Sequence, residues 1–355
     1  MADNSRAHSL ICQTKPWATN ENSVWLASTV ALSRNIERFK FPGRLSGDLK
    51  KQILSLIEKV PLDVEGLVHP ILVRADEMSP LEKEYLGEHF LSVNSFQNAA
   101  LGEGFIVDES GEFLASLNLQ DHIQFLLIDR KGELEHTWNR LAKIEMAMGQ
   151  SMTYSFSQKF GFLTSNPTQC GTALVATVYL QIPGMIHSGK IDAYLEEHTD
   201  EAINITGIHG NPVDIIGDIL MIQNNYTLGL TEETILSSIR HFVTKLLAEE
   251  HSARQAIKTG ESSDVKDIVS RAYAILVHSY QIEAVEALNA ISLLKLGLEM
   301  DWVEGVSLMD LNRLFFNCRR AHLLEQFGEK VSQEDILHKR AEYIHKTLKN
   351  LKLKI

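Results

Sequence analysis

The stretch from Gly161 to Pro183 constrains the fold more strongly than any other part of the chain. From Ala173 onward, apolar side chains alternate with other side chains up to Pro183, and this is the period of a half-buried β-strand. The residues just before it, 165–168 and 171–172, consist of turn-forming Ser, Asn, Pro, Thr and Gly. The pattern predicts a polar loop at one end of a rigid strand, an arrangement typical of binding sites. A hairpin connection without chemistry would have the same pattern.

The composition of the chain excludes several classes of protein. Its 355 residues are enough for two domains with their own cores. The formal net charge of -12 argues against a general nucleic-acid binder, because no basic excess is present to displace counterions from phosphates. We see no apolar run of the roughly 20 residues that a membrane span needs, and no signal peptide at the start. We therefore expect a cytoplasmic protein that binds neither nucleic acid nor a membrane. The widely separated Cys12, Cys170 and Cys318 predict no disulfide framework and no cysteine-based metal site.

Hydrophobic periodicity divides the rest of the chain into a mixed region and a helical region. Strand character is present at residues 24–35, 104–108, 112–117 and 122–128, and helical spacing at 46–60, 79–88, 133–149, 192–205 (leading into a strand), 231–258, 267–300 (two helices), 307–326 and 332–351. Gly260 and two serines break the pattern between the regions. We predict a flexible N-terminal arm over residues 1–21, a first domain over 22–258 and a helical domain over 264–355.

Two smaller patterns allow a structural and a functional interpretation. The aromatic residues Tyr154, Phe156 and Phe160 are predicted to be core residues rather than a stacking surface. The basic end, residues 346–354, is interpreted as a solvated helix face, with nucleic-acid contact as the alternative.

Residues 166–176 resemble the strongest motif of a known enzyme family. They read Asn-Pro-Thr-Gln-Cys-Gly-Thr-Ala-Leu-Val-Ala. The ATP:guanidino phosphotransferase (phosphagen kinase) family has Cys-Pro-Thr-Asn-x-Gly-Thr-Gly-Leu-Arg-Ala, followed by a strand. The resemblance places Asn166 where the family has its active-site cysteine, and Val175 where it has a nucleotide-binding arginine.

A second match lies in the first predicted strand, and a third directly follows the predicted helix at 79–88. The family motif Ser-Ser-Arg-Ile-Arg-Leu-Ala-Arg-Asn falls on residues 27–35, where Arg34 and Asn35 are kept and Ser28 stands at a nucleotide-binding position of the family. Thr29 and Ala31 stand where the family has two arginines that hold nucleotide phosphates, and neither can supply that charge. His89 matches a family histidine near the nucleotide base, although a histidine after a helix is also a common C-terminal cap or surface residue.

The predicted turn before residue 122 resembles the family's Asn-Glu-Glu-Asp-His-x-Arg motif. Leu119 and Gln120 replace the two glutamates that, in the family, orient and deprotonate the guanidinium, and Gln124 replaces a phosphate-binding arginine. A glutamine accepts hydrogen bonds but cannot act as a general base near neutral pH. The retained residues at 118, 121 and 122 are interpreted as braces of the turn.

Residues 205–214 resemble the mobile loop of bacterial protein arginine kinases, Arg-Gly-x-x-Gly-Glu-Gly-x-Glu. Thr206 replaces its arginine and Asn211 its catalytic glutamate, while Pro212 is expected to stiffen the loop. The same subfamily has an Arg-Asp-x-x-Arg-Ala motif that binds phosphoarginine near its C-terminus. The matching positions are Ile336, Leu337 and Arg340, of which only the last keeps the family residue.

The resemblance covers roughly residues 22–345 and implies an α+β fold. A catalytic-type domain with a mostly antiparallel sheet flanked by helices is expected, followed by an α-helical C-terminal domain. Phosphoryl transfer to a guanidinium needs cations around the phosphates, usually with magnesium, and carboxylates that align the nucleophile. Because these groups are missing at the matching positions, we expect no cofactor and no metal. The chain is then interpreted as a pseudokinase, a binding or regulatory protein in stress response and Clp proteolysis.

The family suggests protein partners for such a role: a zinc-finger kinase activator, the Clp unfoldase, an active kinase, or a second copy in a homodimer. The alternative is an active kinase that phosphorylates protein arginine with Mg-ATP in a rebuilt site. For that site the sequence offers a few nearby cations, namely Arg34, Arg44, His89, His122 and His209. A third possibility is an assembly protein whose cleft holds a peptide.

Overall fold

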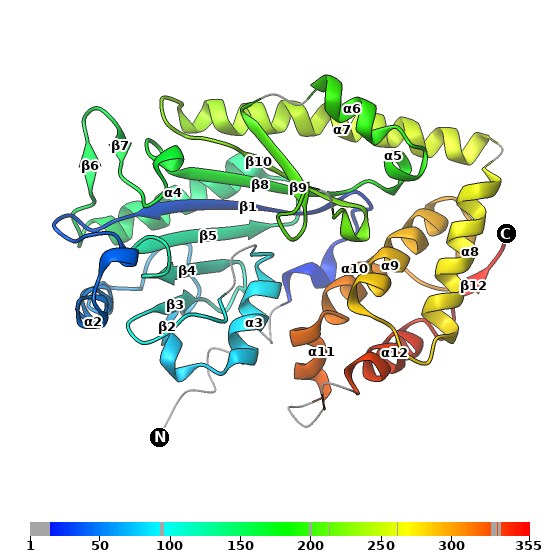
Figure 1. Cartoon of the computed structure of the whole chain (residues 1–355), viewed down its shortest axis with the longest axis horizontal. Coiled ribbons are helices and arrows are strands. Elements are labelled where there is room, and N and C mark those ends of the chain that lie inside the picture. Colours follow the sequence, from blue (N-terminus) through cyan, green and yellow to red (C-terminus); the bar gives the residue numbers. More distant parts are fainter. Residues whose placement is uncertain are drawn as a thin grey trace.

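The strand that the sequence predicts before Pro183 lies inside an eight-stranded sheet (Figure 1). The computed structural model describes residues 15–355 apart from 93–95, 199–200, 213, 261, 328–331 and 333–334. The strands of the sheet are β1 (Trp25–Arg34), β2 (Ile71–Arg74), β3 (Gly104–Val107), β4 (Phe113–Leu117), β5 (Ile123–Asp129), β8 (Leu174–Gln181), β9 (Ile203–Gly207) and β10 (Ile219–Asn224). Their order is β2-β3-β4-β5-β1-β8-β10-β9, and all neighbours are antiparallel.

Alternation along the strands gives the sheet one apolar face and one mixed face. Leu174, Ala176 and Val178 of β8 are fully buried in a core with helices α2 (Gly47–Ile57), α4 (Leu134–Gly149) and α7 (Glu232–Thr259). Burying one large apolar side chain contributes about 1.5–3 kcal/mol, and a slip of one residue would turn the whole set outward. The register is therefore fixed by burial, and the residues in between, such as Val175 and Thr177, face the other side.

The helix starts that the sequence predicts are confirmed by their caps. The Ser46 hydroxyl accepts a hydrogen bond from the Leu49 amide at the start of α2, and Thr231 caps α7 in the same way. Ser79 forms a capping box with Glu82 at the start of α3 (Pro80–His89). Each cap satisfies a backbone amide that would otherwise lack a partner, which contributes roughly 1 kcal/mol. The short helices α5 (Pro183–His187) and α6 (Ile191–His198) follow β8.

The C-terminal region is helical, as predicted, with one difference. Its helices are α8 (Ser263–His278), α9 (Ala284–Glu299), α10 (Leu308–Asn317), α11 (Arg320–Phe327) and α12 (Ile336–Thr347). The helix expected over 307–326 is two helices, because the chain turns at Cys318 after the end of α10. Helical periodicity continues across this turn, which is why the sequence pattern does not show the break.

Two predictions from apolar and basic composition are wrong. Phe156 and Phe160 lie on a hairpin formed by β6 (Phe156–Ser157) and β7 (Gly161–Phe162), and they are 60% and 44% exposed rather than core residues. The chain end at 346–354 is only partly helical. Its β12 (Lys352–Leu353) pairs with β11 (Val303–Glu304), a contact distant in sequence that no local pattern reveals.

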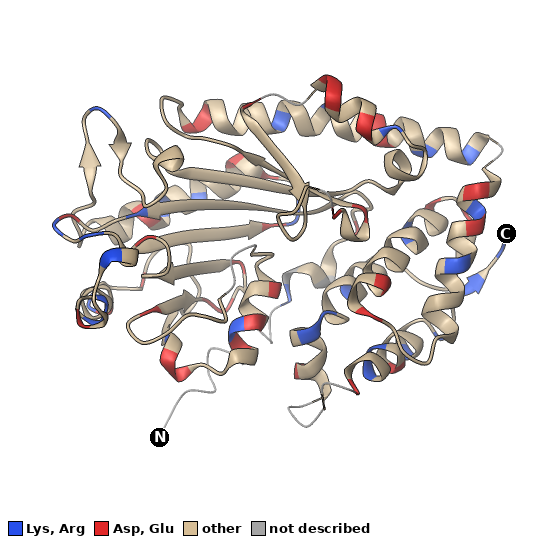
Figure 2. Cartoon of the chain, in the orientation of Figure 1, with Lys and Arg blue, Asp and Glu red and all other residues tan. Residues whose placement is uncertain are grey.

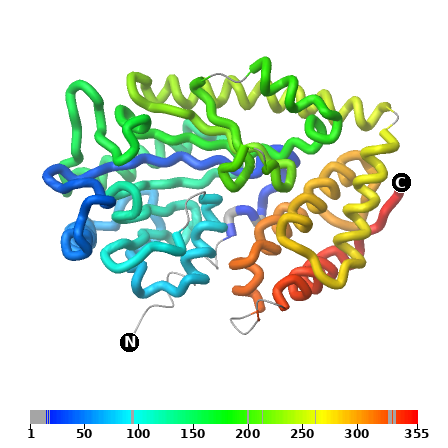
Figure 3. The backbone as a smooth tube through the Cα atoms, viewed as in Figure 1, coloured from blue at the N-terminus to red at the C-terminus, as the bar shows by residue number. Residues whose placement is uncertain are grey.

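The two regions meet around the first described residues (Figure 3). Of the arm that the sequence predicts over residues 1–21, residues 1–14 lie outside the described part. The short helix η1 (Pro16–Thr19) follows, and its Trp17 is 1% exposed. The Trp17 ring stacks on Phe316 of α10 at 4.4 Å and meets His322 of α11 edge-on at 5.1 Å. This segment is therefore anchored between the sheet domain and the helical domain.

Charged residues are concentrated outside the sheet (Figure 2). Strands β3, β4, β8, β9 and β10 contain no Lys, Arg, Asp or Glu. Within the described residues, no helix combines the length and the apolar character that crossing a membrane requires.

Candidate functional site

The mixed face of the sheet is hollowed by two adjoining cavities. The inner cavity, of about 220 Å³, and the outer cavity, of about 500 Å³, share Phe96, Ser116, Gln120 and Gln124 in their walls. The remaining described residues of the inner wall are Thr29, Ala31, Phe90, Leu91, Ser92, Leu114, Leu126, Gln169, Val175, Thr177, Tyr179, Met221 and Gln223. The outer wall adds Asn98, Ala99, Glu103 and Leu119. We refer to the two cavities together as the cleft.

Strand register brings four predicted phosphate positions together in this cleft. Ala31 lies opposite Val175 on one side and Leu126 on the other, and Thr29 lies two residues further along β1. Gln124 projects from β5 into both cavities. Residues paired across antiparallel strands share a face, so the side chains at these positions converge, as the family resemblance implies.

Two other predicted nucleotide positions do not line the cavities. Thr206 on β9 is opposite Met221 and hence on the cleft side of the sheet, but it is buried, and its hydroxyl finds no hydrogen-bond partner among the described residues. Ser28 points to the opposite face, where its hydroxyl donates to the Asp129 carboxylate at 2.9 Å. Ser28 thereby holds the turn after β5.

The turn at 118–122 contains both residues that hold the turn together and residues that line the cleft. Asn118 has a left-handed backbone (φ 59°), and its amide donates to the carbonyl oxygens of Lys50 and Gly102. The Asp121 carboxylate accepts from the Asn35 side chain and from the Ser165 amide, both at 2.7 Å. The interpretation of these residues as braces of the turn is confirmed.

His122 is the third brace of this turn. Its Nδ1 accepts from the Ile36 amide at 2.9 Å and its Nε2 lies 3.0 Å from the Lys40 carbonyl oxygen. Burial lowers the pKa of His122, so the ring is neutral at pH 7. Only Leu119 and Gln120, the positions of the missing glutamates, reach the cleft.

The loop before β8 contributes one residue to the cleft wall, and it is not the residue that the family resemblance predicts. Asn166 caps the short helix η4 (Pro167–Gln169), accepting from the Thr168 amide and hydroxyl, and does not line either cavity. Gln169, at the end of that helix, does. Neither Gln169 nor Gln223 was among the residues predicted for the site. The alternation along β10 is the signal that could have identified the latter.

The loop after β9 lies away from the cavity walls. Its Asn211 is exposed, with a side-chain hydrogen bond to Asp214 at 3.2 Å, and does not line either cavity. The loop is closed by hydrogen bonds at its base, from the Gly207 amide to the Asn211 carbonyl oxygen and from Gly210 to Gly207, each 2.8 Å. A β-carbon at Gly207 would lie 1.9 Å from the Asp214 carbonyl oxygen, so only glycine fits there.

His89 is buried behind the cleft, beside the Phe90 that lines it. Its Nε2 lies 2.8 Å from the Gly111 carbonyl oxygen, and the Trp17 ring lies edge-on to it at 4.4 Å. Burial, together with the charge of His322, holds the pKa of His89 well below its ordinary value. A neutral, enclosed ring does not offer a cation to a phosphate.

The predicted phosphoarginine position in α12 is a structural arginine. Arg340 is 2% exposed and donates to two carbonyl oxygens, those of Cys318 and Ile282, both at 2.8 Å. It ties the turn between α10 and α11 to the start of the α9 segment. Ile336 is also buried, whereas Leu337 packs at the edge of a small apolar cluster. The three positions do not form an anion site.

The other cations suggested by the sequence are equally occupied or distant. The Arg34 guanidinium contacts Glu145 at 2.7 Å and lies over the Phe162 ring at 3.6 Å. Arg44 and His209 are exposed and line neither cavity. Arg319, which the sequence analysis did not place near the cleft, donates to the Glu88 carbonyl oxygen at 3.0 Å. It is not part of the described cavity walls, although its charge acts on Tyr179 in the inner wall.

The described walls of the cleft carry very little charge. Its described walls contain no Lys, Arg or His, and their one carboxylate, Glu103, is paired with Lys50 at 2.5 Å. The described residues also contain no group of three or more His, Cys, Asp or Glu that could hold a metal ion. Arginine side chains and magnesium ions are common partners of phosphate in phosphoryl-transfer sites, and the described cleft walls supply neutral amides and hydroxyls instead.

Comparison with protein families and curated sequences places these features in context. Residues 52–253 match the model of the ATP:guanido phosphotransferase C-terminal catalytic domain, and residues 262–354 match that of the protein-arginine kinase McsB C-terminal domain. The protein-arginine kinase of Chlamydia pneumoniae is 34% identical over 337 residues, which are 93% of each chain. That of Halothermothrix orenii is 28% identical, over 91% of this chain and 93% of the relative.

Solved structures agree with the fold. The substrate-free duplicated taurocyamine kinase of Schistosoma mansoni matches 74% of this chain with a TM-score of 0.57 and 22% identity, and the chain spans 39% of that duplicated protein. A lombricine kinase matches with a TM-score of 0.56 and 20% identity, over 72% of each chain. At these identities the likeness establishes the α+β fold and leaves the chemistry to the residues of the cleft.

Proposed function

The chain belongs to the protein-arginine kinase family of ATP:guanido phosphotransferases, and on this premise we propose that it is a pseudokinase, a binding or regulatory protein that does not transfer phosphate. One observation carries the proposal: the described walls of the inherited cleft are without cations, and their only carboxylate is paired. Without these groups, neither a triphosphate nor a guanidinium nucleophile is held in a reactive position.

Magnitudes support the same conclusion. A hydrogen bond from a charged group contributes about 1.5–3 kcal/mol, which is roughly 10- to 150-fold in affinity. The family resemblance implies arginines at five positions that hold Thr29, Ala31, Gln124, Val175 and Thr206 here. Losing several such contacts at once removes more affinity than one or two neighbouring groups can restore.

The proposed role is exercised through other proteins in the cytoplasm, in stress response and Clp proteolysis. The partners we propose are a zinc-finger kinase activator, the Clp unfoldase, an active kinase, or a second copy of the chain. A pull-down from the native cell with the full-length chain, analysed by mass spectrometry, tests this. Recovery of none of these partners would contradict the partner assignment but not the absence of catalysis.

The absence of nucleotide binding is tested by isothermal titration with Mg-ATP. We expect no binding tighter than about 1 mM, with an active protein-arginine kinase titrated under the same conditions as a positive control. Micromolar affinity would contradict the proposal.

The alternative, an active enzyme with a rebuilt site, is tested by incubating the protein with labelled ATP and an arginine-rich protein. Acid-labile phosphate on that protein would establish the alternative.

A further inference from the structure

We propose that the cleft binds an extended peptide segment with uncharged side chains, which four glutamine side chains hold by hydrogen bonds. This inference rests on the proposed function, because it assigns a ligand to the same cleft. It depends on the hydrogen-bonding state of the glutamines, on the lack of charge around them and on the length of the cleft.

Four glutamines from four separate elements converge on the cleft. Gln120 belongs to the turn before β5, Gln124 to β5 itself, Gln169 to the end of η4, and Gln223 to β10. Gln124, Gln169 and Gln223 are half-buried, and Gln120 is exposed. None of the four carboxamides makes a hydrogen bond to another described residue, whereas the buried Gln181 on the same sheet is bonded at both ends.

A carboxamide matches the hydrogen-bonding groups of a peptide backbone. Each glutamine offers two N–H donors and one acceptor oxygen, and each peptide bond offers one N–H and one C=O. Groups that are already partly removed from water lose little further hydration when a ligand pairs with them. Apolar side chains lie between the amides in the cleft wall, including Phe90, Leu126 and Met221. These would receive apolar side chains of the peptide.

Charge selects against ionised ligands. Moving an ion into a partly enclosed cleft costs hydration free energy that only an opposite charge or several directed donors can return. The described walls offer no free charge of either sign, because Glu103 is paired with Lys50. An arginine, phosphate or carboxylate side chain is therefore disfavoured against a neutral one of the same shape.

The length of the cleft favours a peptide over a small molecule. Its walls run from Ser116 on β4 to Gln223 on β10, across the order β4-β5-β1-β8-β10. Four intervals between neighbouring strands span roughly 19 Å, which is the length of five or six extended residues. The outer cavity alone, about 500 Å³, is within the usual range of ligand pockets.

Blocked hexapeptide pools test the inference on the full-length chain. One neutral pool is built from Ala, Leu, Ser and Asn, and an acidic pool has Asp in place of Asn. A second matched pair carries citrulline or arginine at one position, so each pair differs in charge at nearly constant shape. Binding is followed through the side-chain amide NMR signals of the four glutamines. We expect each neutral pool to shift these signals at concentrations at least ten times lower than its charged counterpart.

Variants locate the binding in the cleft. We expect Gln124→Arg to weaken binding of the neutral pools at least tenfold, and Gln223→Leu to weaken it severalfold. Gln52→Arg, on the exposed side of α2, is the matched control and should leave binding unchanged. Thermal unfolding checks that each variant is folded. If Gln124→Arg does not fold, the binding measured for Gln223→Leu still tests the inference.

Three outcomes would overturn the inference: no pool shifts the glutamine signals, a charged pool binds as tightly as its neutral counterpart, or folded cleft variants bind like the parent chain. These failures are distinguishable from failure of the proposed function. Tight Mg-ATP binding would defeat the proposed function, whereas absence of both ATP and peptide binding would leave a pseudokinase and remove only the peptide ligand.

Discussion

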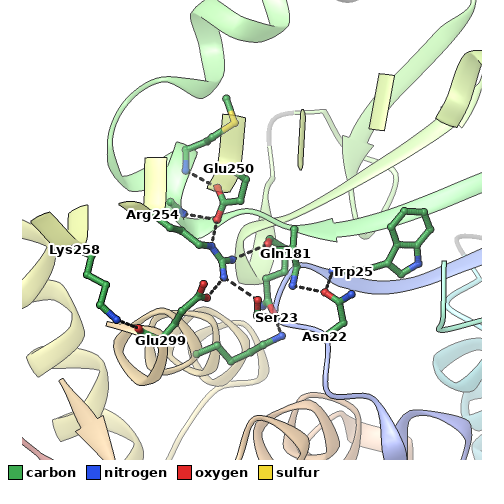
Figure 4. Close-up of polar contacts among 12 residues, drawn as sticks. Asn22, Ser23, Trp25, Gln181, Glu250, Arg254, Lys258 and Glu299 are labelled. Atoms are coloured by element: carbon green, nitrogen blue, oxygen red, sulfur yellow. Dashed lines mark hydrogen bonds and ion pairs between the residues drawn. The ribbon is translucent and has the colours of Figure 1, made fainter. Parts of the chain in front are cut away.

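Polar side chains have partners inside the chain at the joint between the two domains, whereas the glutamines of the cleft lack them among the described residues. By the joint we mean the contacts of Glu250 and Arg254 of α7 with the start of α5 and with Glu299 of α9. In the joint, Glu250 is fully buried, and its carboxylate accepts from the Gly184 amide, the Met185 amide and Arg254 at 2.5–2.9 Å (Figure 4). Arg254 also bonds Glu299 of α9, across the joint. In the cleft, the glutamines have no such partners among the described residues.

The difference between the two regions depends on where the partner of a charged side chain comes from. A buried charge is tolerated when the same chain supplies its partner, as Arg254 and Glu250 do for each other. A charge whose partner is a ligand has no such compensation inside the chain, and the described cleft walls carry no charge of this kind. Similar substitutions in the two regions should therefore have different effects.

Arg254→Met should lower the free energy of unfolding by about 3–5 kcal/mol, because it leaves Glu250 buried without its cation. Urea unfolding followed by circular dichroism measures this. Arg271→Met is the control: Arg271 pairs with Asp267 on the exposed face of α8, and such pairs contribute about 0–1 kcal/mol. Equal losses in the two variants would remove the distinction between paired burial and surface pairing.

Adding charge to the cleft should create a phosphate site. The double variant Gln124→Arg with Val175→Arg places two guanidinium groups on adjacent parts of the inner wall. Each contact with phosphate contributes about 1.5–3 kcal/mol, so tripolyphosphate affinity should rise by about 10- to 150-fold per arginine. Titration calorimetry measures it.

The control for this variant is Gln52→Arg with Gln255→Arg, which adds the same charge on exposed helix positions. An equal gain in the control would mean that net charge alone, and not the geometry of the cleft, attracts the anion.

The same glutamine substitution should have different costs in the two regions. Gln181 is 1% exposed, donates to the Gly217 carbonyl oxygen at 2.7 Å and accepts from Lys295. Gln181→Leu leaves both partners without this hydrogen bond and should lower the free energy of unfolding by about 1–3 kcal/mol. Gln223→Leu, in the cleft, should stay within about 0.5 kcal/mol of the parent chain. A large loss in Gln223→Leu would show that this glutamine has a structural role.

Lys295 should make the stability of the joint depend on pH. Burial, followed by the charge of Arg254, lowers the pKa of Lys295 to about 7, against an ordinary value of 10.5. Between these values the unfolded chain binds the extra proton and the folded chain does not. Stability should therefore rise with pH from about 7 to 10.5, by at most about 1.4 kcal/mol per unit.

The variant Lys295→Met removes this dependence, since no proton remains to be released. Urea unfolding at intervals of pH measures it, with Lys258→Met at a more exposed position as the control that keeps the slope. A parent chain whose stability does not change over this window would show that Lys295 titrates normally.

Most secondary structure follows from local pattern, and so could be predicted. The alternation of β8 and the caps Ser46, Ser79 and Thr231 depend on residues within one turn or strand, and each is found in the structure. The exposure of Phe156 and the pairing of β11 with β12 depend on what else packs nearby. Apolar composition alone does not tell a buried phenylalanine from one on a projecting hairpin.

The candidate site also has a part that could be predicted from the sequence and a part that could not. The family resemblance assigned Thr29, Ala31, Gln124 and Val175 to one site, and strand register brings them into one cleft wall. Ser28 and Asn166 belong to the same motifs but contact Asp129 and Thr168 instead. Gln169, which lies within the motif at residues 166–176, and Gln223 also line the cleft, although neither was predicted as a site residue. Which neighbour in a motif faces the cavity is decided by strand twist and turn geometry.

By itself, the sequence determined the strand and helix pattern, because this pattern depends on residue type and spacing along the chain. Through its resemblance to a known family it also indicated the fold and the lack of cationic residues at the phosphate positions. Only the tertiary structure decided that Arg34 and Arg340 are held by partners inside the chain. It also supplied the contacts of Asp121 and His122, which the sequence had suggested as braces of the turn. It also decided that the cleft is a neutral track lined by unpaired amides. Pairing and burial join residues more than a hundred positions apart, such as Arg34 with Glu145, and no local pattern records such contacts.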